Sequence, residues 1–313
     1  MRKKFLVTGG AGFIGSHLCE NLLNKNSEVI CFDNLSTGRL KNIEHIKDKI
    51  VFVRGDANNF IDLEPIFKNN KLNGVFHHAA IVGVKRTIES PIDVLNDIES
   101  ARNILNLALK YNKPKVVFAS SSEVYGEPTE IPEIESGHIN PQMPYAVTKL
   151  YCEKLMESYW QKYKLPTCSL RFFNVYGPRQ ESSDYGFVIG IFIKRVLRGM
   201  QPIIYGDGTQ TRDFVYIDDN IEATIKAMES SRTNGEVVNI GTGRPTTILD
   251  LAKKIIDVCG LKKDLKPKFI KRRDDVRHRF PDIDKMRNLL NFKPQYDLEK
   301  GLEKTVDWYK KEI

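Results

Sequence analysis

Three regularly spaced glycines follow the first apolar segment of the chain. The segment is Phe-Leu-Val at residues 5–7, and Gly9, Gly12 and Gly15 come next, in front of a helix-like stretch at residues 16–24. A strand that turns sharply into a helix needs residues without a Cβ at the turn, beside a bound phosphate, and where the helix packs on the strand. The free N–H groups and positive dipole end of that helix favour an anion. The pattern therefore predicts a dinucleotide pyrophosphate site.

A carboxylate, Asp33, follows the second apolar run, residues 28–32. Its separation from the glycines is the one at which a carboxylate accepts hydrogen bonds from both ribose hydroxyls of an adenosine. An acid in that place repels a 2′-phosphate, so we predict NAD rather than NADP as the cofactor. The alternative is that Asp33 is an ordinary turn residue at the end of a strand, before Asn34.

Apolar segments alternate with helical segments through the first half of the chain. Such alternation builds a parallel sheet with helices on both faces, so we predict an α/β fold, a Rossmann-type doubly wound parallel sheet, over residues 1–171. Gly- and Pro-punctuated segments predict a smaller mixed α/β substrate lobe over 172–313, closing over the carboxyl ends of the strands. Runs near 214–215 and 237–240 are candidates to return to the main sheet. The predicted strands are 4–8, 28–32, 50–54, 73–77, 115–119 and 166–171, and the predicted helices are 14–25, 60–69, 91–111 and 145–163.

Composition limits the classes to which the protein can belong. The 313 residues carry a net charge of +8, with the excess concentrated in residues 262–279. That stretch lacks interleaved aromatic residues and contains acids, so a doubly negative small molecule explains it better than nucleic acid does. No apolar run approaches the ~20 residues that cross a membrane, and the five cysteines form no C-x-x-C pair. We expect a cytoplasmic protein with reduced thiols, no metal site and no membrane or nucleic-acid partner.

Candidate catalytic groups follow the fifth predicted strand, at Ser121, Ser122 and Glu123, and open a helix, at Tyr145 and Lys149. Lowering a phenol pKa from ~10 to about 7 requires roughly 4 kcal/mol. An ammonium about 6 Å away, at an effective dielectric constant of about 20, supplies roughly 3 kcal/mol, and a bound cationic nicotinamide can supply the rest. We predict that Tyr145 is a base and that Ser121, less readily Ser122, completes the proton relay. Y-x-x-x-K alone is common in helices, so the prediction depends on its conjunction with the glycine turn and the preceding serines.

Longer motifs extend the pattern along nearly the whole chain. They are T-G-G-A-G-F-I-G at Thr8, D-N-L-S-T-G at Asp33, G-D at Gly55, H-x-A-A at His77, S-S-S-x-V-Y-G at Ser120, Y-x-x-x-K at Tyr145, R-F-F-N-V-Y-G-P-R at Arg171, G-x-x-x-R-D-F-V-Y-I-D-D at Gly208 and R-x-x-D-V-R-H-R-x-P-D-I at Arg272. Together they closely resemble the extended short-chain dehydrogenase/reductase family, specifically its NAD-dependent nucleotide-sugar epimerases, dehydratases and decarboxylases. The resemblance implies that Tyr145 takes the proton of a sugar 4-hydroxyl while hydride leaves C4 for NAD, giving a 4-keto sugar.

The resemblance also implies roles for the matching positions. The implied cofactor contacts are Gly9, Gly12, Phe13, Ile14, Gly15, Asp33, Asn34, Ser36, Thr37, Gly38, Asp56, Ala57, Ala79, Ala80, Tyr145, Lys149 and Phe172. The implied catalytic residues are Ser121, Ser122, Glu123, Tyr145 and Lys149. The implied substrate-binding residues are Asn174, Arg212 and Arg272, which would hold the diphosphate of a nucleotide sugar, and Arg179 and Asp275, which would lie nearby. Planar bidentate arginines suit diphosphate oxygens, although a lone arginine is more often a surface group.

The fate of the 4-keto sugar divides the family. Dehydratases that resemble this chain carry Asp-Glu after the catalytic hydroxyl residue, whereas this chain has Ser122-Glu123, and serine is a poor acid for expelling a hydroxyl. The Ser-Glu pair and Arg279 look like those of UDP-glucuronate decarboxylases. Residues 84–91, 144–149 and 275–278 look like those of UDP-sugar 4-epimerases. We favour a 4-epimerase of the UDP-glucose or UDP-N-acetylglucosamine type, with UDP-glucuronate decarboxylase or a related nucleotide-sugar dehydratase as the alternative.

Two further readings concern partners. A non-enzymatic dinucleotide-sensing protein is a distant alternative, because such descendants usually lose the tyrosine or the lysine, and both are present. A homodimer is expected because helices 91–111 and 145–163 carry apolar residues beyond one face, and relatives pair these helices into a four-helix bundle. Burial of both helices against their own sheet is the alternative. The apolar residues in question are Ile98, Ile104, Leu105, Leu107, Leu109, Leu150, Leu155, Met156, Tyr159 and Trp160.

Overall fold

The computed structural model describes residues 2–183, 186–260, 265–271 and 276–312. Its centre is a seven-stranded sheet of order β10-β6-β5-β4-β1-β2-β3, in which all neighbouring strands run parallel. The predicted doubly wound sheet is confirmed, and all six predicted strands match to within two residues at each end. The strands are β1 (Lys4–Thr8), β2 (Glu28–Asp33), β3 (Val51–Arg54), β4 (Gly74–His77), β5 (Lys115–Ser121), β6 (Thr167–Phe172) and β10 (Glu236–Ile240).

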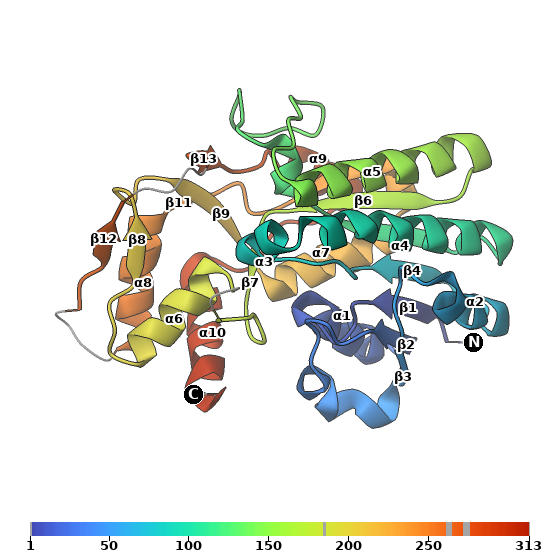
Figure 1. The fold of residues 1–313 in the computed structure, drawn as a ribbon, viewed down its shortest axis with the longest axis horizontal. Helices are drawn as coiled ribbons and strands as arrows, with labels where there is room; N and C mark the ends of the chain where they lie inside the picture. Colours follow the sequence, from blue (N-terminus) through green and yellow to red (C-terminus); the bar gives the residue numbers. More distant parts are fainter. Residues whose placement is uncertain (1, 184–185, 261–264, 272–275, 313) are drawn as a thin grey trace.

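Helices cover both faces of this sheet (Figure 1). Along β1, Phe5 and Val7 pack into one hydrophobic cluster and Leu6 into another, because alternate side chains of a strand point to opposite faces. The first cluster includes residues of α1 (Phe13–Asn24) and α7 (Ile217–Glu229). The second includes residues of α2 (Phe60–Asn69), α4 (Pro91–Lys110) and α5 (Pro144–Tyr163). The four predicted helices are therefore confirmed, and burial on both faces explains why the central strands are apolar throughout.

A smaller lobe lies beside the carboxyl ends of the strands (Figure 1). A four-stranded sheet joins β9 (Thr211–Tyr216) to β7 (Asn174–Tyr176), β11 (Pro245–Thr247) and β13 (His278–Arg279), and β8 (Ile203–Tyr205) pairs with β12 (Lys268–Ile270). Residues 236–240 join the main sheet as β10, but residues 214–215 lie in β9, so their predicted return to that sheet is wrong. The other elements are α3 (Val84–Glu89), α6 (Val188–Leu197), α8 (Ile248–Cys259), α9 (Asp284–Leu290), α10 (Leu298–Glu312), η1 (Leu40–Asn42), η2 (Glu44–Lys49), η3 (Ser122–Tyr125) and η4 (Ser231–Thr233).

A buried ion pair holds α5 against the main sheet. The guanidinium of Arg171, on β6, donates to both carboxylate oxygens of Glu153, on α5, from Nε at 3.0 Å and from Nη2 at 2.7 Å. Ser120, on β5, donates its hydroxyl to Glu153 Oε1 at 2.5 Å. Both charged side chains are only 2% exposed, so each charge depends on the other for its stabilisation. The pair fixes the helix that carries Tyr145 and Lys149 to the two strands beneath it.

Three structural findings concern the thiols, metal sites and membrane-spanning helices. All five cysteines are buried and free. Within residues 2–183, 186–260, 265–271 and 276–312, no group of three His, Cys, Asp or Glu side chains is placed to hold a metal ion. The same described ranges contain no helix that is long and apolar enough to cross a membrane.

We predict that Glu153→Gln lowers the free energy of unfolding by about 3–5 kcal/mol, because the charge of Arg171 stays buried without its partner. Denaturant unfolding followed by circular dichroism measures the loss. The matched control is Glu157→Gln on the same helix, where Glu157 pairs with Lys154 at 3.0 Å and the two side chains are 37% and 68% exposed. That exposed pair contributes at most about 1 kcal/mol. Equal losses in the two variants would contradict the role given to the buried pair.

Candidate active site

A cavity of about 1410 Å³ lies at the carboxyl ends of the main-sheet strands, against the smaller lobe. Ligands of open α/β sheets bind at this edge, where strand order reverses. The cavity brings together 21 of the predicted site residues, which come from segments far apart in the sequence. They are Gly9, Gly12, Phe13, Ile14, Gly15, Asp33, Asn34, Ser36, Thr37, Asp56, Ala57, Ala79, Ala80, Ser121, Ser122, Glu123, Tyr145, Lys149, Phe172, Asn174 and Arg179.

The glycine turn between β1 and α1 leaves no room for side chains. A Cβ on Gly15 would lie 2.1 Å from the carbonyl oxygen of Gly9, and a Cβ on Gly9 would lie 2.8 Å from the backbone nitrogen of Ala79. Gly9 also has a φ of +67°, a conformation that favours glycine. The first turn of α1 has no side-chain cap and no acidic residue, and Phe13, Ile14 and Gly15 line the cavity, so its N–H groups are available as a cradle for phosphate.

Asp33 ends β2 at the same edge and is only 7% exposed. Its two carboxylate oxygens accept hydrogen bonds from the backbone N–H of Ala11 at 2.9 Å and of Leu35 at 2.8 Å. Burial raises the pKa of Asp33, and the two backbone hydrogen bonds oppose that rise. Gly38 does not line the cavity, but its backbone passes so close that a Cβ there would lie 2.6 Å from Asp33 Oδ1. Gly38 thus lets the following loop fold over the carboxylate.

His78 is a cavity residue that the sequence prediction missed. It follows β4, beside Ala79, and its Nε2 is buried without a hydrogen-bond partner among the described residues. Burial, followed by the nearby charge of Lys149, lowers the pKa of His78 to about 3, so the ring is neutral. A bound ligand can supply the partner that Nε2 lacks. The glycine cradle, the Asp33 carboxylate and the unpaired His78 Nε2 together fit a site for NAD. The signal was present in the sequence, at the variable position of H-x-A-A.

The predicted catalytic groups converge at the end of β5. Lys149 is 4% exposed and donates from Nζ to the carbonyl of Ala119 at 2.8 Å, with Nζ 5.4 Å from the centre of the Tyr145 ring. Burial lowers the pKa of Lys149. Burial also raises the pKa of Tyr145, with Glu123 and Asp97 adding to the rise, whereas a hydrogen bond with Ser121 opposes it. The chain by itself therefore keeps Tyr145 protonated, and the predicted phenolate needs a further positive charge.

Glu123, on η3, lines the cavity and forms an ion pair with Arg279 of β13. The Arg279 side chain is 3% exposed and that of Glu123 is 46% exposed. Arg279 Nη1 donates to Glu123 Oε1, and Nη2 donates to the carbonyl of Gly126 at 2.9 Å. Ser122, beside Glu123, is 5% exposed. A carboxylate with one face toward the cavity thus lies two residues after Ser121.

The predicted substrate-binding residues are dispersed in the structure. Asn174 lines the cavity and donates to the carbonyl of Asp213 at 3.1 Å. Arg179 also lines it, but forms an ion pair with Glu20 on α1 at 2.7 Å. Arg212 lies on β9 and is 9% exposed, outside the set of cavity residues. The other two predicted substrate-binding residues, Arg272 and Asp275, lie outside the described residues.

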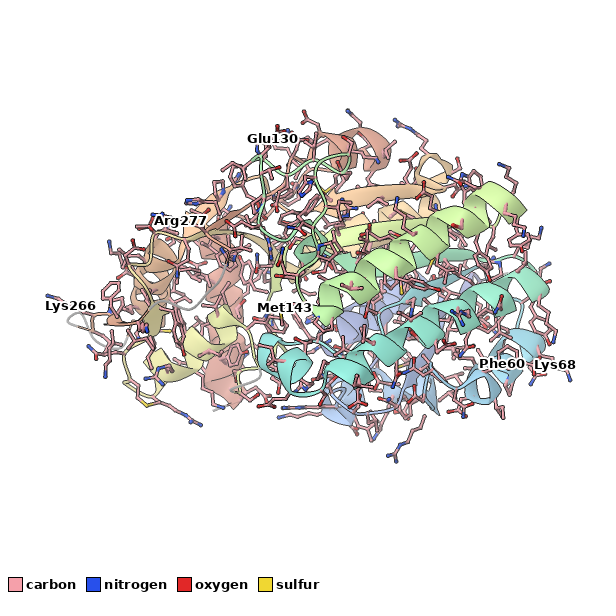
Figure 2. The ribbon with its side chains drawn as sticks, turned by 45° about the horizontal axis from the view of Figure 1, so that its top comes forward. Phe60, Lys68, Glu130, Met143, Lys266 and Arg277 are labelled. Atoms are coloured by element: carbon pink, nitrogen blue, oxygen red, sulfur yellow. The ribbon has the colours of Figure 1, made fainter. Side chains whose placement is uncertain are left out.

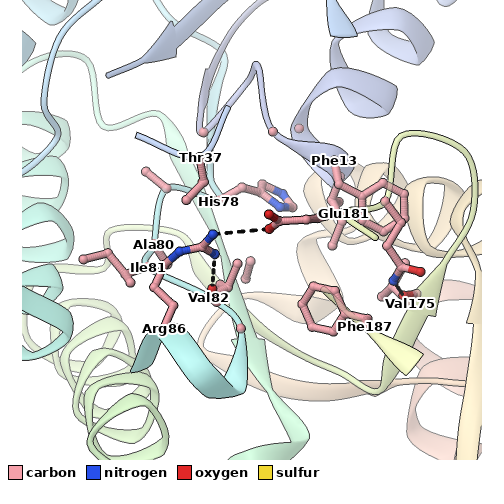
Figure 3. Close-up of a pocket in the computed structure, with 18 of the residues that line it drawn as sticks. Phe13, Thr37, His78, Ala80, Ile81, Val82, Arg86, Val175, Glu181 and Phe187 are labelled. Atoms are coloured by element: carbon pink, nitrogen blue, oxygen red, sulfur yellow. Dashed lines mark hydrogen bonds and ion pairs between the residues drawn. The ribbon is translucent and has the colours of Figure 1, made fainter. Parts of the chain in front are cut away.

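An ion pair that the sequence did not indicate crosses the cavity (Figure 3). Arg86, on α3, donates from Nη2 to Glu181 of the segment after β7 at 3.4 Å, and from Nη1 to the carbonyl of Val82 at 2.7 Å. The two charged side chains are 23% and 26% exposed. Because their segments are far apart in the sequence and in different lobes, only the fold brings them together.

Comparison with known proteins agrees with this geometry. Residues 5–241 match the model of the NAD dependent epimerase/dehydratase family. The chain is 40% identical, over 97% of its length and 98% of the relative's, to a putative UDP-glucose 4-epimerase of Methanocaldococcus jannaschii. It is 37% identical, over 99% and 98%, to a UDP-N-acetyl-alpha-D-glucosaminuronate decarboxylase of Bacillus cytotoxicus. The structure of UDP-glucose 4-epimerase with UDP-glucose from Thermotoga maritima matches with a TM-score of 0.93 and 36% identity over 99% of each chain. The chain therefore belongs to the NAD-dependent epimerase/dehydratase family.

Proposed function

We propose that the protein is an NAD-dependent UDP-sugar 4-epimerase of the UDP-glucose or UDP-N-acetylglucosamine type. The main observation in support is that Ser121, Tyr145 and Lys149 converge at one end of the cavity. The glycine cradle and Asp33 line another part of the same cavity. Membership of the family and the similarity to UDP-glucose 4-epimerases support this assignment.

Each catalytic side chain has a task that its surroundings allow. Tyr145 accepts the proton of the sugar 4-hydroxyl, and the hydroxyl of Ser121, already hydrogen-bonded to Tyr145, orients that proton transfer. Lys149 holds its charge 5.4 Å from the Tyr145 ring centre, where it stabilises the phenolate. NAD, when bound, would supply the acceptor for the hydride that leaves sugar C4 and a positive charge that favours the phenolate. Tyr145 later returns its proton, whichever face of the sugar is reduced.

The substrate diphosphate would lie toward the smaller lobe. Asn174 is the predicted contact with a donor group at the cavity wall. Arg179 is held on the cofactor side by Glu20 and by the hydroxyl of Ser16 at 3.3 Å, so its contact with a diphosphate would require that ion pair to open. Arg212, Arg272 and Asp275 keep their proposed roles, although Arg212 lies outside the set of cavity residues and the other two lie outside the described residues.

A second candidate function is UDP-glucuronate decarboxylation, favoured by the Glu123–Arg279 pair and by the similarity to the B. cytotoxicus decarboxylase. In that reaction the 6-carboxylate leaves as carbon dioxide, and its bonding electrons pass to the 4-keto group. We rank it second because residues 84–91, 144–149 and 275–278 look like those of UDP-sugar 4-epimerases.

Two further properties belong to the proposal. We place the protein in the cytoplasm, because five buried free thiols suit a reducing compartment. We also propose a homodimer built on the outer faces of α4 and α5, which lie side by side in Figure 2. Of the apolar residues first singled out on these helices, Ile104, Leu105, Leu107 and Met156 are buried in the chain's own core, so they are not available to a partner.

We predict that the purified protein interconverts UDP-glucose with UDP-galactose, or UDP-N-acetylglucosamine with its 4-epimer, and releases no carbon dioxide from UDP-glucuronate. Chromatographic separation of the products after incubation with each of the three substrates and NAD measures this. Carbon dioxide released from UDP-glucuronate, without epimerisation of the neutral sugars, would replace the proposed function by the second candidate.

The control for that experiment separates catalysis from binding. Tyr145→Phe should lower turnover by about 10²–10⁴-fold, because the base is lost, while NAD affinity stays within a few-fold of that of the unmodified chain. Tyr163→Phe, at the far end of the same helix, removes a hydroxyl from a side chain that is 38% exposed, and should change neither quantity. Turnover retained by Tyr145→Phe would show that another group is the base.

We predict that light scattering gives the mass of a dimer, and that Leu95→Glu combined with Tyr151→Glu gives that of a monomer. Leu95 on α4 and Tyr151 on α5 are 36% and 40% exposed, and burying their apolar surface in a partner would stabilise the dimer. The control is Ile61→Glu on α2, where Ile61 is 76% exposed. A monomer before substitution, or a dimer that survives the double substitution, would contradict this interface.

A further inference from the structure

Glu133 is a buried carboxyl with no assigned task in the proposed reaction. It lies in the connection between η3 and α5, where its N–H donates to the carbonyl of Phe280 at 3.0 Å and its carbonyl accepts from Asp282 at 2.9 Å and from Asn239 at 3.0 Å. The residue is 3% exposed, and neither carboxylate oxygen has a hydrogen-bond partner among the described residues. Its backbone is therefore firmly held while its acidic group lacks the partners that buried acids normally have.

Arg279 connects this carboxyl to the active site. Its Nη1 and Nη2 bind Glu123 and Gly126, but Nε, also buried and without a hydrogen bond, lies 3.8 Å from Glu133 Oε1. That separation is too long for a hydrogen bond and short enough for strong charge interaction. The guanidinium thus stands between two carboxyls, of which Glu123 reaches the cavity and Glu133 does not.

We propose that Glu133 is a positioning residue that determines, through Arg279, how firmly Glu123 is held and how much of its negative charge acts on Tyr145. The inference rests on the proposed function, in which Tyr145 is the base. While Glu133 is protonated, the charge of Arg279 neutralises Glu123 alone. When Glu133 releases its proton to water, two carboxylates share one guanidinium, and more of the Glu123 charge is left to oppose the formation of a phenolate.

The charges around Glu133 make this change accessible near neutral pH. Three charged groups face it from separate elements, namely Arg279 on β13, Glu123 on η3 and Arg212 on β9, the cross-strand neighbour of Arg279. Burial raises the pKa of Glu133 to about 8, Glu123 adds to the rise, and the two arginines oppose it. The protonated form therefore prevails at pH 7 and is lost as the pH rises above about 8.

The test compares pH profiles of kcat/KM for UDP-glucose in the presence of NAD. We expect the profile of the unmodified protein to fall several-fold between pH 7 and pH 9, and the Glu133→Gln profile, permanently uncharged at this position, to lose that fall. Glu135→Gln is the matched control, because Glu135 is a neighbouring acid whose carboxylate accepts from the Asn239 N–H at 2.8 Å and is not paired with Arg279. An unchanged fall in Glu133→Gln, or its loss in Glu135→Gln, would overturn the inference.

A second measurement does not depend on activity. Carbon-13 NMR of the unmodified protein, labelled at glutamate side chains, should show one carboxyl titrating near pH 8 and the Glu123 signal shifting in the same step. Glu123→Gln identifies the Glu123 signal by its loss. If no carboxyl titrates between pH 7 and pH 9, or if the Glu123 signal does not follow, the inference is wrong. If the two carboxyl signals do titrate together but no UDP-sugar is turned over, the proposed function is wrong, whereas the link between the two carboxyls stands.

Discussion

The two hydrogen bonds from Arg171 to Glu153 are the interaction on which the active site depends. They join β6 to α5 inside the core, and the Ser120 hydroxyl on β5 completes the network. Helix α5 carries Tyr145 and Lys149, whereas Ser121 lies on β5. A displacement of about 1 Å can cost positioned catalytic groups about 10²-fold in rate, so the proposed catalytic centre, divided between a helix and a strand, needs a rigid connection between them. A buried ion pair supplies this connection, because separating the two side chains would leave each with a buried charge that no opposite charge compensates.

Burial disfavours the charged form of the titratable groups at both ends of the cavity. At the cofactor end it raises the pKa of Asp33, and the hydrogen bonds from two backbone N–H groups oppose that rise. At the sugar end it raises the pKa of Tyr145 and lowers that of Lys149, so both groups are uncharged more readily than in water. The phenolate therefore forms only when the full set of positive charges is assembled.

The sequence allowed most of the main sheet to be predicted and little of the smaller lobe. Parallel strands buried on both faces are continuous apolar runs, so β1 to β6 stand out from their surroundings. The strands β7, β11 and β13 have three residues or fewer, too few for a period to show. Residues 214–215 are as apolar as a main-sheet strand, yet they pair with β7. The same limit applies to the site, because the ion pairs of Arg179 and Arg86 join segments 159 and 95 residues apart.

Local patterns were enough to predict the glycine turn, the acid at the end of β2, the serines at the end of β5 and the Tyr145–Lys149 pair, since in each of them the spacing carries the chemistry. The packing of distant segments was needed to show that Glu123 is bound by Arg279, that the Glu133 carboxylate lies beside that arginine without a hydrogen-bond partner among the described residues, and that Arg86 pairs with Glu181 across the cavity. The physical reason is that a local pattern constrains the backbone within a few turns, whereas contacts between distant side chains depend on how the two lobes pack.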